Sequence, residues 1–478
     1  MCIGMIFSAN GQTSVWDGSH STWTNGAGTQ ESPYLIENAA QLAHLAYIVN
    51  NGIGANYYYI VGAGTYWKLM TDIDLNGSET FQWTPIGYYY YNYYSFGGNF
   101  DGNNHTIANL YINTTTLKRI GLFGYTNSAT IKNLGITGSS SITRGSVWGD
   151  AYAGAIAGFA DNTDFDNCYN TGSVSASSSS ANSDSSYSGG IVGYSNATTV
   201  NNCYNTGNVF SSSPASYNYY SGGIVGYAEN TTVNNCYNTG NVSAAIATYY
   251  SVSYSGGIVG RGSGSAINNC YNMGSVSSSS STSYSYSYSG GIVGETASTT
   301  TVNNCYNTGN ISSDASSHSG GIVGHKSSSA AVYYSYYLVS CGGGNTYGGE
   351  AKTEEAMKDA EFITLLNQDL ATPAWKMDCT TPINNGFPIL LWQTCAGSDA
   401  VETIENQSII IYPNPAKDII TVASSELQNE TYTVFSISGQ ALMRGKLQGE
   451  TTTVNVSALA SGIYFIKAGN YAEKFVKD

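Results

Sequence analysis

The chain has 478 residues, a formal net charge of −15 and only 10% charged residues. Ordinary globular domains carry about 25% charged residues, so a low charge combined with 56 glycines and 41 tyrosines favours a structure of turns and short strands. The negative charge argues against non-specific binding to nucleic acid, and no apolar run reaches the length of about 18 residues that a membrane-spanning helix needs.

The first residues form a short segment of distinct composition. Residues 1–7 are mostly apolar, and residues 8–12 are small and polar. This order is typical of the end of a secretory signal peptide. We therefore interpret residues 1–12 as a signal-peptide remnant, with an ordinary N-terminal segment as the alternative.

Residues 13–115 are predicted to form an N-terminal cap and the first, divergent repeats of a solenoid. Residues 38–51 predict a helix, because Asn38 is a suitable N-cap and Gln41 follows three residues later. We expect this helix to cover the open end of the first repeat. The tyrosine-rich residues 88–94 predict a protruding loop.

Residues 116–345 contain two alternating motifs, Ser-Gly-Gly-Ile-Val-Gly and Asn-Cys-Tyr-Asn. The cysteines of the second motif follow one another at intervals of 35, 33, 34 and 35 residues. They are Cys168, Cys203, Cys236, Cys270 and Cys305. A fixed period of this length is typical of a stacked repeat architecture.

One repeat contains three short extended runs separated by turn signals. In the repeat that follows Gly189, these runs are Gly-Gly-Ile-Val-Gly, residues 199–204, and a run that begins at Asn208. A single repeat cannot bury its apolar face, so the repeats must stack, with strands pairing at about 4.8 Å per step. The predicted fold is all-β: a parallel β-helix with short capping helices.

Stacking requires equivalent residues to form columns along the solenoid. Leu134 occupies the cysteine position of an earlier repeat, so we predict that this position faces inward and that the five cysteines are a structural core ladder. Metal binding is the alternative, but there is no Cys-x-x-Cys pair, and we predict no metal site. The asparagine before each cysteine is interpreted as an internal hydrogen-bonding ladder. These asparagines are Asn202, Asn235, Asn269 and Asn304.

A tyrosine precedes each Ser-Gly-Gly-Ile-Val-Gly motif or its earlier form. These tyrosines are Tyr152, Tyr187, Tyr220, Tyr254 and Tyr288, and His318 takes the sixth place. Stacking predicts an aligned, exposed row of rings. The row has two interpretations: rings that only pack on each other, or a surface that also binds a glycan or a partner protein.

Residues 346–397 are predicted to form the C-terminal cap of the solenoid, with one helix over residues 353–370. Cys379 and Cys395 are candidates for a disulfide in an oxidising compartment, whereas Cys341 has no assigned role. The polar, acidic residues 398–407 are a predicted linker.

The repeat region resembles proteins with the GLUG motif. The resemblance depends on Phe-Asp-Gly-Asn-Asn-His-Thr-Ile at residues 100–107, Gly-Leu-Phe-Gly at 121–124 and Ile-Lys-Asn-Leu at 131–134, followed by the two repeated motifs. It covers roughly residues 30–340 and implies a right-handed β-helix on a secreted or surface protein of bacteria. Some relatives are adhesins, and the repeat itself implies no catalysis.

Residues 408–478 contain five predicted strands separated by turns, which indicates a small Ig-like β-sandwich. This segment resembles the type A C-terminal sorting domain of the type IX secretion system of Bacteroidetes. The matching positions are Tyr412, Pro413, Asn414, Pro415, Gly439, Gly462, Tyr464 and Lys474. The resemblance implies that the secretion machinery is a partner, and that the chain crosses the outer membrane and is attached to the cell surface or released. An unrelated Ig-like module is the alternative.

No enzyme motif is found: His-Glu-x-x-His, Gly-x-Ser-x-Gly and the phosphate-binding loop are all absent from the sequence. We predict no cofactor. The enzymatic alternative is a β-helix polysaccharide lyase or glycoside hydrolase, whose carboxylates gather on one face of neighbouring repeats. The candidates are Asp161, Asp164 and Asp166, with Asp101 and His105 as a second group.

The sequence therefore predicts a secreted, surface-displayed β-helix that acts as an adhesin or structural binding module. Surface glycan, lipopolysaccharide or host matrix are the candidate ligands, with no nucleic acid and no transmembrane segment. The alternatives are a polysaccharide-active enzyme and an inert spacer.

Overall fold

The computed structural model describes residues 14–56, 59–88, 94–144, 149–177, 184–213, 218–246, 250–280, 285–314, 318–344, 347–395, 410–423, 430–436, 440–449, 451–468 and 471–478. The predicted signal-peptide remnant, the linker, Gly439 and most of the tyrosine-rich loop lie outside these residues. The chain forms two compact units, Met1–Gln393 and Thr394–Asp478.

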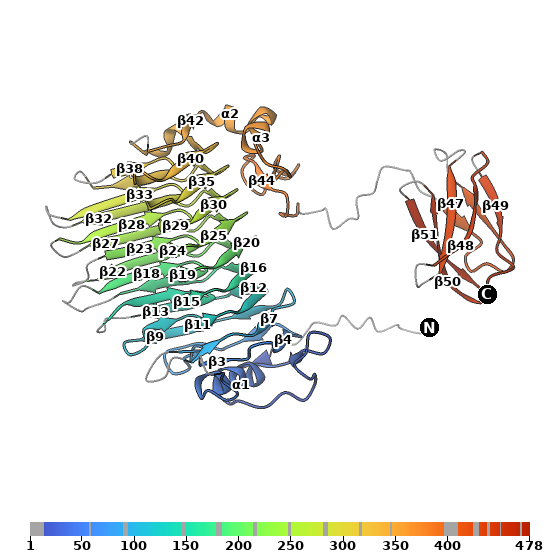
Figure 1. Cartoon of the computed structure of the whole chain (residues 1–478), viewed down its shortest axis with the longest axis horizontal. Coiled ribbons are helices and arrows are strands. Elements are labelled where there is room, and N and C mark those ends of the chain that lie inside the picture. The colour runs from blue at the N-terminus through green and yellow to red at the C-terminus, as the bar shows by residue number, and fades with distance from the viewer. Residues whose placement is uncertain are drawn as a thin grey trace, which may run out of the picture. The chain divides into compact units, whose positions relative to one another are not determined.

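The first unit is a parallel β-helix, as predicted (Figure 1). A representative rung contributes one or two strands to each of four parallel sheets. In chain order, its strands are β23 (Asn218–Gly222), β24 (Val225–Glu229), β25 (Thr232–Asn234), β26 (Tyr237–Asn238) and β27 (Val242–Ile246). Each strand pairs in parallel with the equivalent strand of the next rung.

Sheet 1 contains β25, β26 and their equivalents. Its other described strands are β1 (Ser14–Val15), β2 (Tyr34–Ile36), β4 (Tyr66–Leu69), β5 (Ile73–Asp74), β7 (Asn99–Asp101), β8 (Thr106–Ala108), β12 (Thr130–Thr137), β16 (Asp164–Asn170), β20 (Thr199–Asn201), β21 (Tyr204–Asn205), β30 (Ala266–Asn268), β31 (Tyr271–Asn272), β35 (Thr301–Asn303), β36 (Tyr306–Asn307), β40 (Ala331–Tyr333), β41 (Tyr336–Leu338) and β42 (Glu350–Lys352).

Sheet 2 contains β24 and its equivalents. Its other described strands are β3 (Ile60–Val61), β6 (Ser95–Phe96), β11 (Phe123–Asn127), β15 (Ala157–Asp161), β19 (Val192–Asn196), β29 (Val259–Ser263), β34 (Val293–Ala297) and β39 (Val323–Lys326).

Sheet 3 contains β27 and its equivalents, and sheet 4 contains β23 and its equivalents. Sheet 3 adds β9 (Tyr111–Thr114), β13 (Ser141–Arg144), β17 (Ser173–Ala176), β22 (Val209–Ser213), β32 (Val276–Ser280) and β37 (Ile311–Ser313). Sheet 4 adds β10 (Arg119–Ile120), β14 (Ala151–Gly154), β18 (Ser185–Gly189), β28 (Val252–Gly256), β33 (Tyr286–Gly290) and β38 (His318–Gly320).

The five cysteines of the repeats are fully buried and lie one above another. The backbone N–H of Cys168 donates to Sγ of Cys203 over 3.4 Å, and the same bond joins Cys203 to Cys236 and Cys270 to Cys305. Their thiols are free. The ladder therefore fills the interior with small, weakly polar side chains.

The asparagines that precede the cysteines make the predicted hydrogen bonds between rungs only in part: Nδ2 of Asn269 donates to Oδ1 of Asn235 over 3.1 Å, whereas Nδ2 of Asn202 donates to Asp166. Asn202 has φ of 51°, and the equivalent residues of neighbouring rungs are also in the left-handed region, which Asn tolerates better than most residues. These residues turn the chain between the two strands of sheet 1, and Asn202, Asn235 and Asn269 are only half-buried, so a second set of asparagines forms the fully buried ladder. That ladder is made by the last residue of Asn-Cys-Tyr-Asn: Asn170, Asn205, Asn238, Asn272 and Asn307, all fully buried.

Both ends of the solenoid are capped. At the N-terminal end lies α1 (Ala39–Asn50), with Asn38 as N-cap accepting from the backbone N–H of Gln41, as the sequence predicts. The predicted helix over residues 353–370 is wrong in its continuity. It consists of α2 (Glu354–Met357) and α3 (Ala360–Leu366), because the Asp359 side chain accepts from the Glu361 N–H and starts a second helix.

The C-terminal cap also contains η1 (Val339–Cys341), β43 (Trp375–Lys376) and β44 (Ile389–Leu390). Cys379 and Cys395 are disulfide-bonded. Among the described residues, none of the helices is long and apolar enough to cross a bilayer.

The second unit is a small antiparallel β-sandwich with a three-stranded and a four-stranded sheet. Its described strands are β45 (Ile410–Tyr412), β46 (Ile419–Ala423), β47 (Thr431–Ser436), β48 (Ala441–Lys446), β49 (Thr451–Asn455), β50 (Gly462–Ala468) and β51 (Tyr471–Lys477). Its core includes Ile420, Val434, Ile466 and Phe475.

Candidate functional site

The predicted tyrosine row is in register along sheet 4. Tyr152 pairs with Tyr187 and stacks on it with ring centroids 4.8 Å apart, and the row continues to His318 at spacings of up to 5.6 Å. The expected exposure is wrong for its centre: Tyr220 is 3% and Tyr254 is 8% exposed. The rings turn their faces toward each other, so the row does not present a flat aromatic platform to a ligand.

A second aromatic column on sheet 2 buries this row. Tyr194 and Tyr227 stack on each other, and their rings contact Tyr187 and Tyr220 edge to face. Burial raises the pKa of Tyr220 to about 12. The sequence already contained this column, because its members follow the Gly-Gly-Ile-Val-Gly motif.

Further along sheet 2, the same column changes from aromatic to charged residues. Arg261 takes the place of Tyr227 in the next rung and is followed by Glu295 and His325. Nε of Arg261 lies 2.6 Å from Oε2 of Glu295, whose other oxygen is 3.4 Å from Nδ1 of His325. This cluster was not predicted, although the order Tyr, Arg, Glu, His after the repeated motif was readable in the sequence.

The tyrosine of Asn-Cys-Tyr-Asn forms a third column on sheet 1. Tyr169, Tyr204 and Tyr237 stack with centroids 4.7 and 4.9 Å apart and nearly parallel rings. The C-terminal cap covers the following members: Trp392 stacks on Tyr237, and Asn384 of the cap donates to the hydroxyl of Tyr306. This column therefore anchors the cap.

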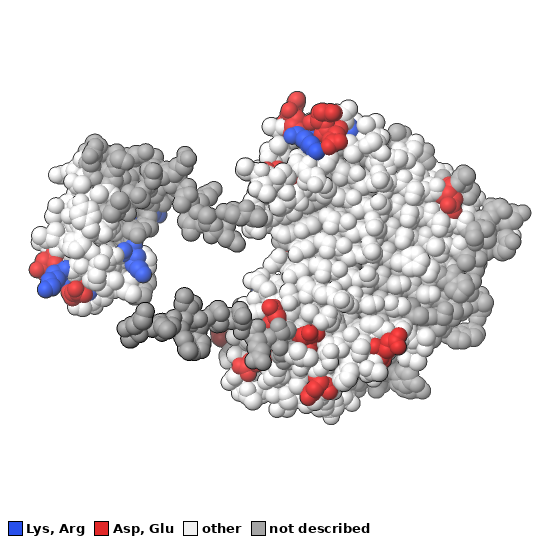
Figure 2. Space-filling model, turned by 180° about the vertical axis from the view of Figure 1, so that it is seen from behind, with Lys and Arg blue, Asp and Glu red and all other residues white. Residues whose placement is uncertain are grey.

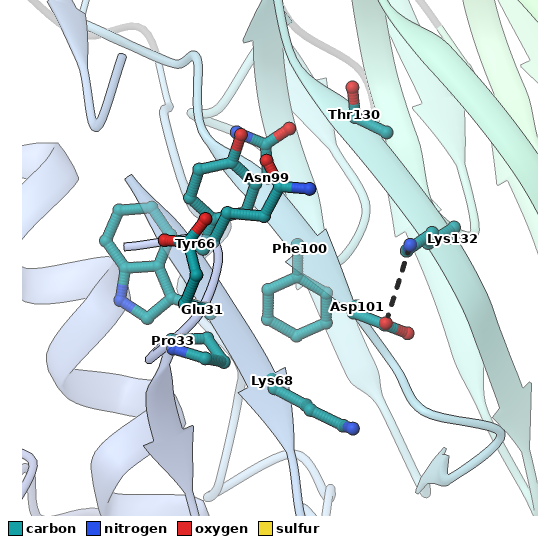
Figure 3. A pocket seen from close by; sticks show the side chains of 11 residues that line it. Glu31, Pro33, Tyr66, Lys68, Asn99, Phe100, Asp101, Thr130 and Lys132 are labelled. Carbon is teal, nitrogen blue, oxygen red and sulfur yellow. Dashed lines mark ion pairs between the residues drawn. The ribbon is translucent and has the colours of Figure 1, made fainter. Parts of the chain in front are cut away.

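A pocket of about 340 Å³ lies on the outer face of sheet 1 near the N-terminal cap (Figure 3). We call it the N-pocket. Its floor is formed by alternate, outward-facing residues of three neighbouring strands, and a segment before β2 forms its wall. The floor residues are Tyr66, Lys68, Asn99, Asp101, Thr130 and Lys132, and the wall residues are Gln30, Glu31 and Pro33.

The charges in the N-pocket alternate from strand to strand. Lys68 pairs in register with Asp101, and Asp101 with Lys132. Oδ1 of Asp101 accepts from the Asn103 N–H and from Nδ2 of Asn133, and Oδ2 lies 3.6 Å from Nζ of Lys132. The Asp101 carboxylate is therefore held in one position.

Lys68 and Glu31 are different, because neither has an ion-pair or hydrogen-bond partner for its side chain within the described part of the chain. Figure 3 shows both side chains among the residues that line the pocket. The N-pocket thus offers one ammonium, one carboxylate and several amide and hydroxyl groups to a ligand.

The acidic residues considered for catalysis lie in different places. Asp164 and Asp166 face outward on β16, where Oδ1 of Asp166 accepts from the side-chain amides of Asn201 and Asn202. Asp161 lies on sheet 2. His105 pairs with Asp72, and not with Asp101. Nowhere in the described residues do three or more His, Cys, Asp or Glu side chains group as metal ligands.

In the β-sandwich, Asn414 of the predicted motif holds the last strand. Asn414 donates from Nδ2 to the Lys474 carbonyl and accepts at Oδ1 from the Val476 N–H. The hydroxyl of the buried Tyr464 donates to the Ala460 carbonyl. Other motif positions are near the surface: Tyr412 is 49% exposed, Pro413, Pro415 and Lys474 are exposed, and Gly462 begins β50.

Comparison with known families places both parts of the chain. Residues 410–478 match the model of the secretion system C-terminal sorting domain, and residues 217–243 match the model of the GLUG motif. The β-helix therefore contains a GLUG motif, and residues 410–478 form a secretion sorting domain. The sorting domain sends this GLUG-motif protein through the type IX secretion system to the cell surface or the exterior.

Similar proteins share only parts of the chain. A "Putative Gly-rich membrane protein" of Evansella cellulosilytica is 37% identical over 116 residues, which cover 23% of this chain and 12% of the relative. "Halomucin" of Haloquadratum walsbyi is 31% identical over 155 residues, 31% of this chain and 2% of the relative. The GLUG-motif protein thus spans a small fraction of both relatives.

Two solved structures are also similar. One is described as a "putative immunoglobulin A1 protease" from Bacteroides ovatus, with 23% identity, a TM-score of 0.47, and coverage of 78% of this chain and 96% of that one. The other is named "IgA1 Protease", with 14% identity, a TM-score of 0.40, and coverage of 63% and 21%.

Proposed function

We propose that this protein is an adhesin-like binding module that presents its solenoid outside the cell and binds glycan in the N-pocket. The sorting domain supports the location. The observation that carries the ligand class is the N-pocket itself, in which Lys68 and Glu31 remain unpaired among the described residues beside Tyr66 and Asn99.

The chemistry of the N-pocket suits a sugar. Sugars need closely spaced hydrogen-bond donors and acceptors with a limited apolar contact, and small-ligand sites combine such groups in a concave surface. Alternating lysine and aspartate side chains supply donors and acceptors at the strand spacing of about 4.8 Å.

The test is binding of the full-length protein to an array that contains bacterial lipopolysaccharides, host-matrix glycans and plant or algal polysaccharides. The Lys68→Met variant should lose about tenfold or more in affinity, since a hydrogen bond from a charged group contributes about 1.5–3 kcal/mol. Lys326→Met is the matched control, because it removes the same charge at the other end of the solenoid. No binding to any glycan, or equal affinity of the two variants, would contradict the proposal.

The enzymatic alternative has one observation in its favour. Asp164 and Asp166 share one face of β16, and alternate residues of a strand are about 6.6 Å apart, a separation at which two carboxylates can flank a glycosidic bond. Release of reducing ends or unsaturated sugars that disappears in Asp166→Asn would favour this function. An inert spacer would neither bind nor cleave.

A further inference from the structure

A second pocket lies on the same face of sheet 1 at the opposite end of the solenoid. We call it the C-pocket; its volume is about 420 Å³. Its floor is made of Asn268, Asn303 and Tyr333, and its wall includes Asp369, which belongs to the segment after α3. Like the N-pocket, it is formed where a cap segment rises beside outward-facing residues of sheet 1.

The floors of the two pockets belong to one column of residues. Strand pairing places equivalent side chains in register from rung to rung, and all of them are at least partly exposed between the pockets. The column is Lys68, Asp101, Lys132, Asp166, Asn201, Asn234, Asn268, Asn303 and Tyr333. We call it the track.

A parallel column of smaller side chains accompanies the track two residues earlier on each strand. In the central rungs it holds Thr199, Thr232, Ala266 and Thr301. Small residues here leave the asparagines of the track accessible from the side. The track is therefore a continuous polar strip, and each of its steps is one strand spacing.

The asparagines of the track keep unused hydrogen-bonding capacity. Nδ2 of Asn268 donates to Oδ1 of Asn234, and Nδ2 of Asn303 donates to Oδ1 of Asn268, each over 2.8 Å. A side-chain amide has two N–H donors and two acceptor lone pairs. Each of these rungs can therefore still offer one donor and one acceptor outward, at a constant spacing.

Charge varies along the track. Lys68, Asp101, Lys132 and Asp166 alternate in sign, and no ionisable residue follows in the column until the C-pocket, where Asp369 lies. Seen from behind, the solenoid carries its charged side chains mainly toward its two ends, with a broad uncharged middle (Figure 2). A polyanion would find no compensating charge over most of this length.

We propose that one linear, largely uncharged, hydroxyl-rich polysaccharide lies along the track and occupies both pockets at once. This inference rests on the proposed glycan binding and names its ligand class. Eight steps of about 4.8 Å give a track of about 38 Å, so only an extended chain of several sugars reaches from one pocket to the other. An extended peptide is a poorer occupant, because the backbone groups of the sheet 1 strands are already used in pairing between rungs.

The test compares oligosaccharides of increasing length, with cello-, manno- and xylo-oligosaccharides as the probes and the full-length protein as the receptor. Affinity should rise by at least about tenfold between a disaccharide and a chain that spans the track, and then remain constant, because additional subsites act as linked binding sites. Longer chains add no contacts once both pockets are filled.

Two substitutions on one rung test whether the polysaccharide binds on the track or elsewhere on the surface. Thr232→Arg places a long side chain beside the centre of the track, whereas Ser243→Arg places the same side chain on the outer face of sheet 3 in the same rung. Thr232→Arg should reduce the affinity for long chains to that for short ones, and Ser243→Arg should not. Unchanged thermal unfolding verifies that both variants are folded.

The outcomes distinguish this inference from the proposed function. If short and long chains bind equally tightly, or Thr232→Arg has no effect, the proposal that a polysaccharide binds along the track is wrong. The proposal of glycan binding in the N-pocket is then unaffected. If none of these neutral probes binds but an acidic glycan binds and Lys68→Met abolishes that binding, the uncharged ligand class is wrong. If no glycan binds at all, both proposals fail.

Discussion

Nδ2 of Asn205 donates to Oδ1 of Asn238 over 2.8 Å in the fully buried interior of the solenoid. The same Nδ2 also donates to the Gly207 carbonyl, so one amide satisfies its own rung and the next. A Cβ on Gly223 would lie 2.4 Å from Cγ of Asn238. The backbone carbonyl of Gly257 would lie closer still, at 2.0 Å, so the buried ladder and the stacked backbone together require glycine at the second position of Gly-Gly-Ile-Val-Gly.

Replacing an asparagine of this buried ladder should reduce the free energy of unfolding substantially. In Asn238→Leu, the Asn205 amide loses its acceptor, and the Gly240 carbonyl loses its donor. An unpaired buried polar group costs about 1–3 kcal/mol, so we expect a loss of at least about 3 kcal/mol in the free energy of unfolding, measured in urea. Asn234→Leu, on the outer face of the same rung, should cost about 1 kcal/mol or less. Equal losses would mean that the buried ladder has no special role.

The repeat period predicted the register of the solenoid, because only stacking of like residues buries the apolar positions. The column that contains Val200 shows this: Phe165, Val233 and Ile267 occupy its neighbouring positions. The period could not show which asparagine faces inward, since both asparagines of Asn-Cys-Tyr-Asn recur equally. The left-handed conformation of Asn202 interrupts the alternation of inward-facing and outward-facing side chains along the strand. As a result, Asn205 faces inward and Asn202 does not.

The sites were harder to predict for a related reason. Alignment of the tyrosine row follows from the period, but its burial depends on the adjacent column on sheet 2, which lies beside it only in the folded chain. The N-pocket requires Glu31 and Pro33, which belong to no repeat. The polar floor is periodic and readable from the sequence, whereas the walls are not.

The buried thiols should be chemically inert in the folded protein. Cys168, Cys236 and Cys305 are fully buried, and burial raises the pKa of each thiol. The reactive thiolate is therefore suppressed, and access is blocked as well. Alkylation at neutral pH followed by peptide mass spectrometry should show no modification of these cysteines without denaturant and full modification in urea. Rapid labelling of the native protein would show that the ladder opens.

Stability should fall in strong alkali because of the buried tyrosines. Burial raises the pKa of Tyr220 to about 12 from an ordinary value of 10.0. In the unfolded chain the phenol loses its proton first, so its stabilising contribution is complete below pH 10 and is lost as the pH rises to about 12. For one such residue this amounts to about 2–3 kcal/mol.

Phenolate absorbance and circular dichroism, followed together against pH, measure this effect. The folded protein should titrate part of its tyrosine absorbance late and together with unfolding, whereas the urea-unfolded chain should titrate all of it near pH 10. In Tyr220→Phe, the alkaline transition should begin at higher pH. A titration curve identical in both states would contradict the prediction.

The pair of Arg261 and Glu295 should be replaceable by the aromatic residues that precede it in its column. Arg261 lies over the rings of Tyr227 and Tyr254, and Glu295 is 13% exposed. Glu295→Gln should destabilise the protein by about 1–3 kcal/mol, because it leaves a half-buried guanidinium without its counterion. The double variant Arg261→Tyr, Glu295→Tyr should be neutral or stabilising, since it extends the tyrosine stack. Thermal unfolding of the single and double variants measures both effects, and a double variant less stable than Glu295→Gln would show that the charges are needed.

Asn414 should control how firmly the C-terminal strand of the sorting domain is held. Its side chain makes two hydrogen bonds to the β51 backbone, at Lys474 and Val476, and the neighbouring Ala416 adds two backbone bonds to the same strand end. Asn414→Ala removes both side-chain bonds, whereas Asn414→Asp keeps the acceptor for the Val476 N–H and loses only the donor. Hydrogen exchange in β51 should therefore accelerate most in Asn414→Ala and less in Asn414→Asp.

If export needs an ordered terminal strand, the amount of protein at the cell surface should fall in the same order. Exchange in β51 that is unchanged in Asn414→Ala would show that the backbone bonds of Ala416 hold the strand without help.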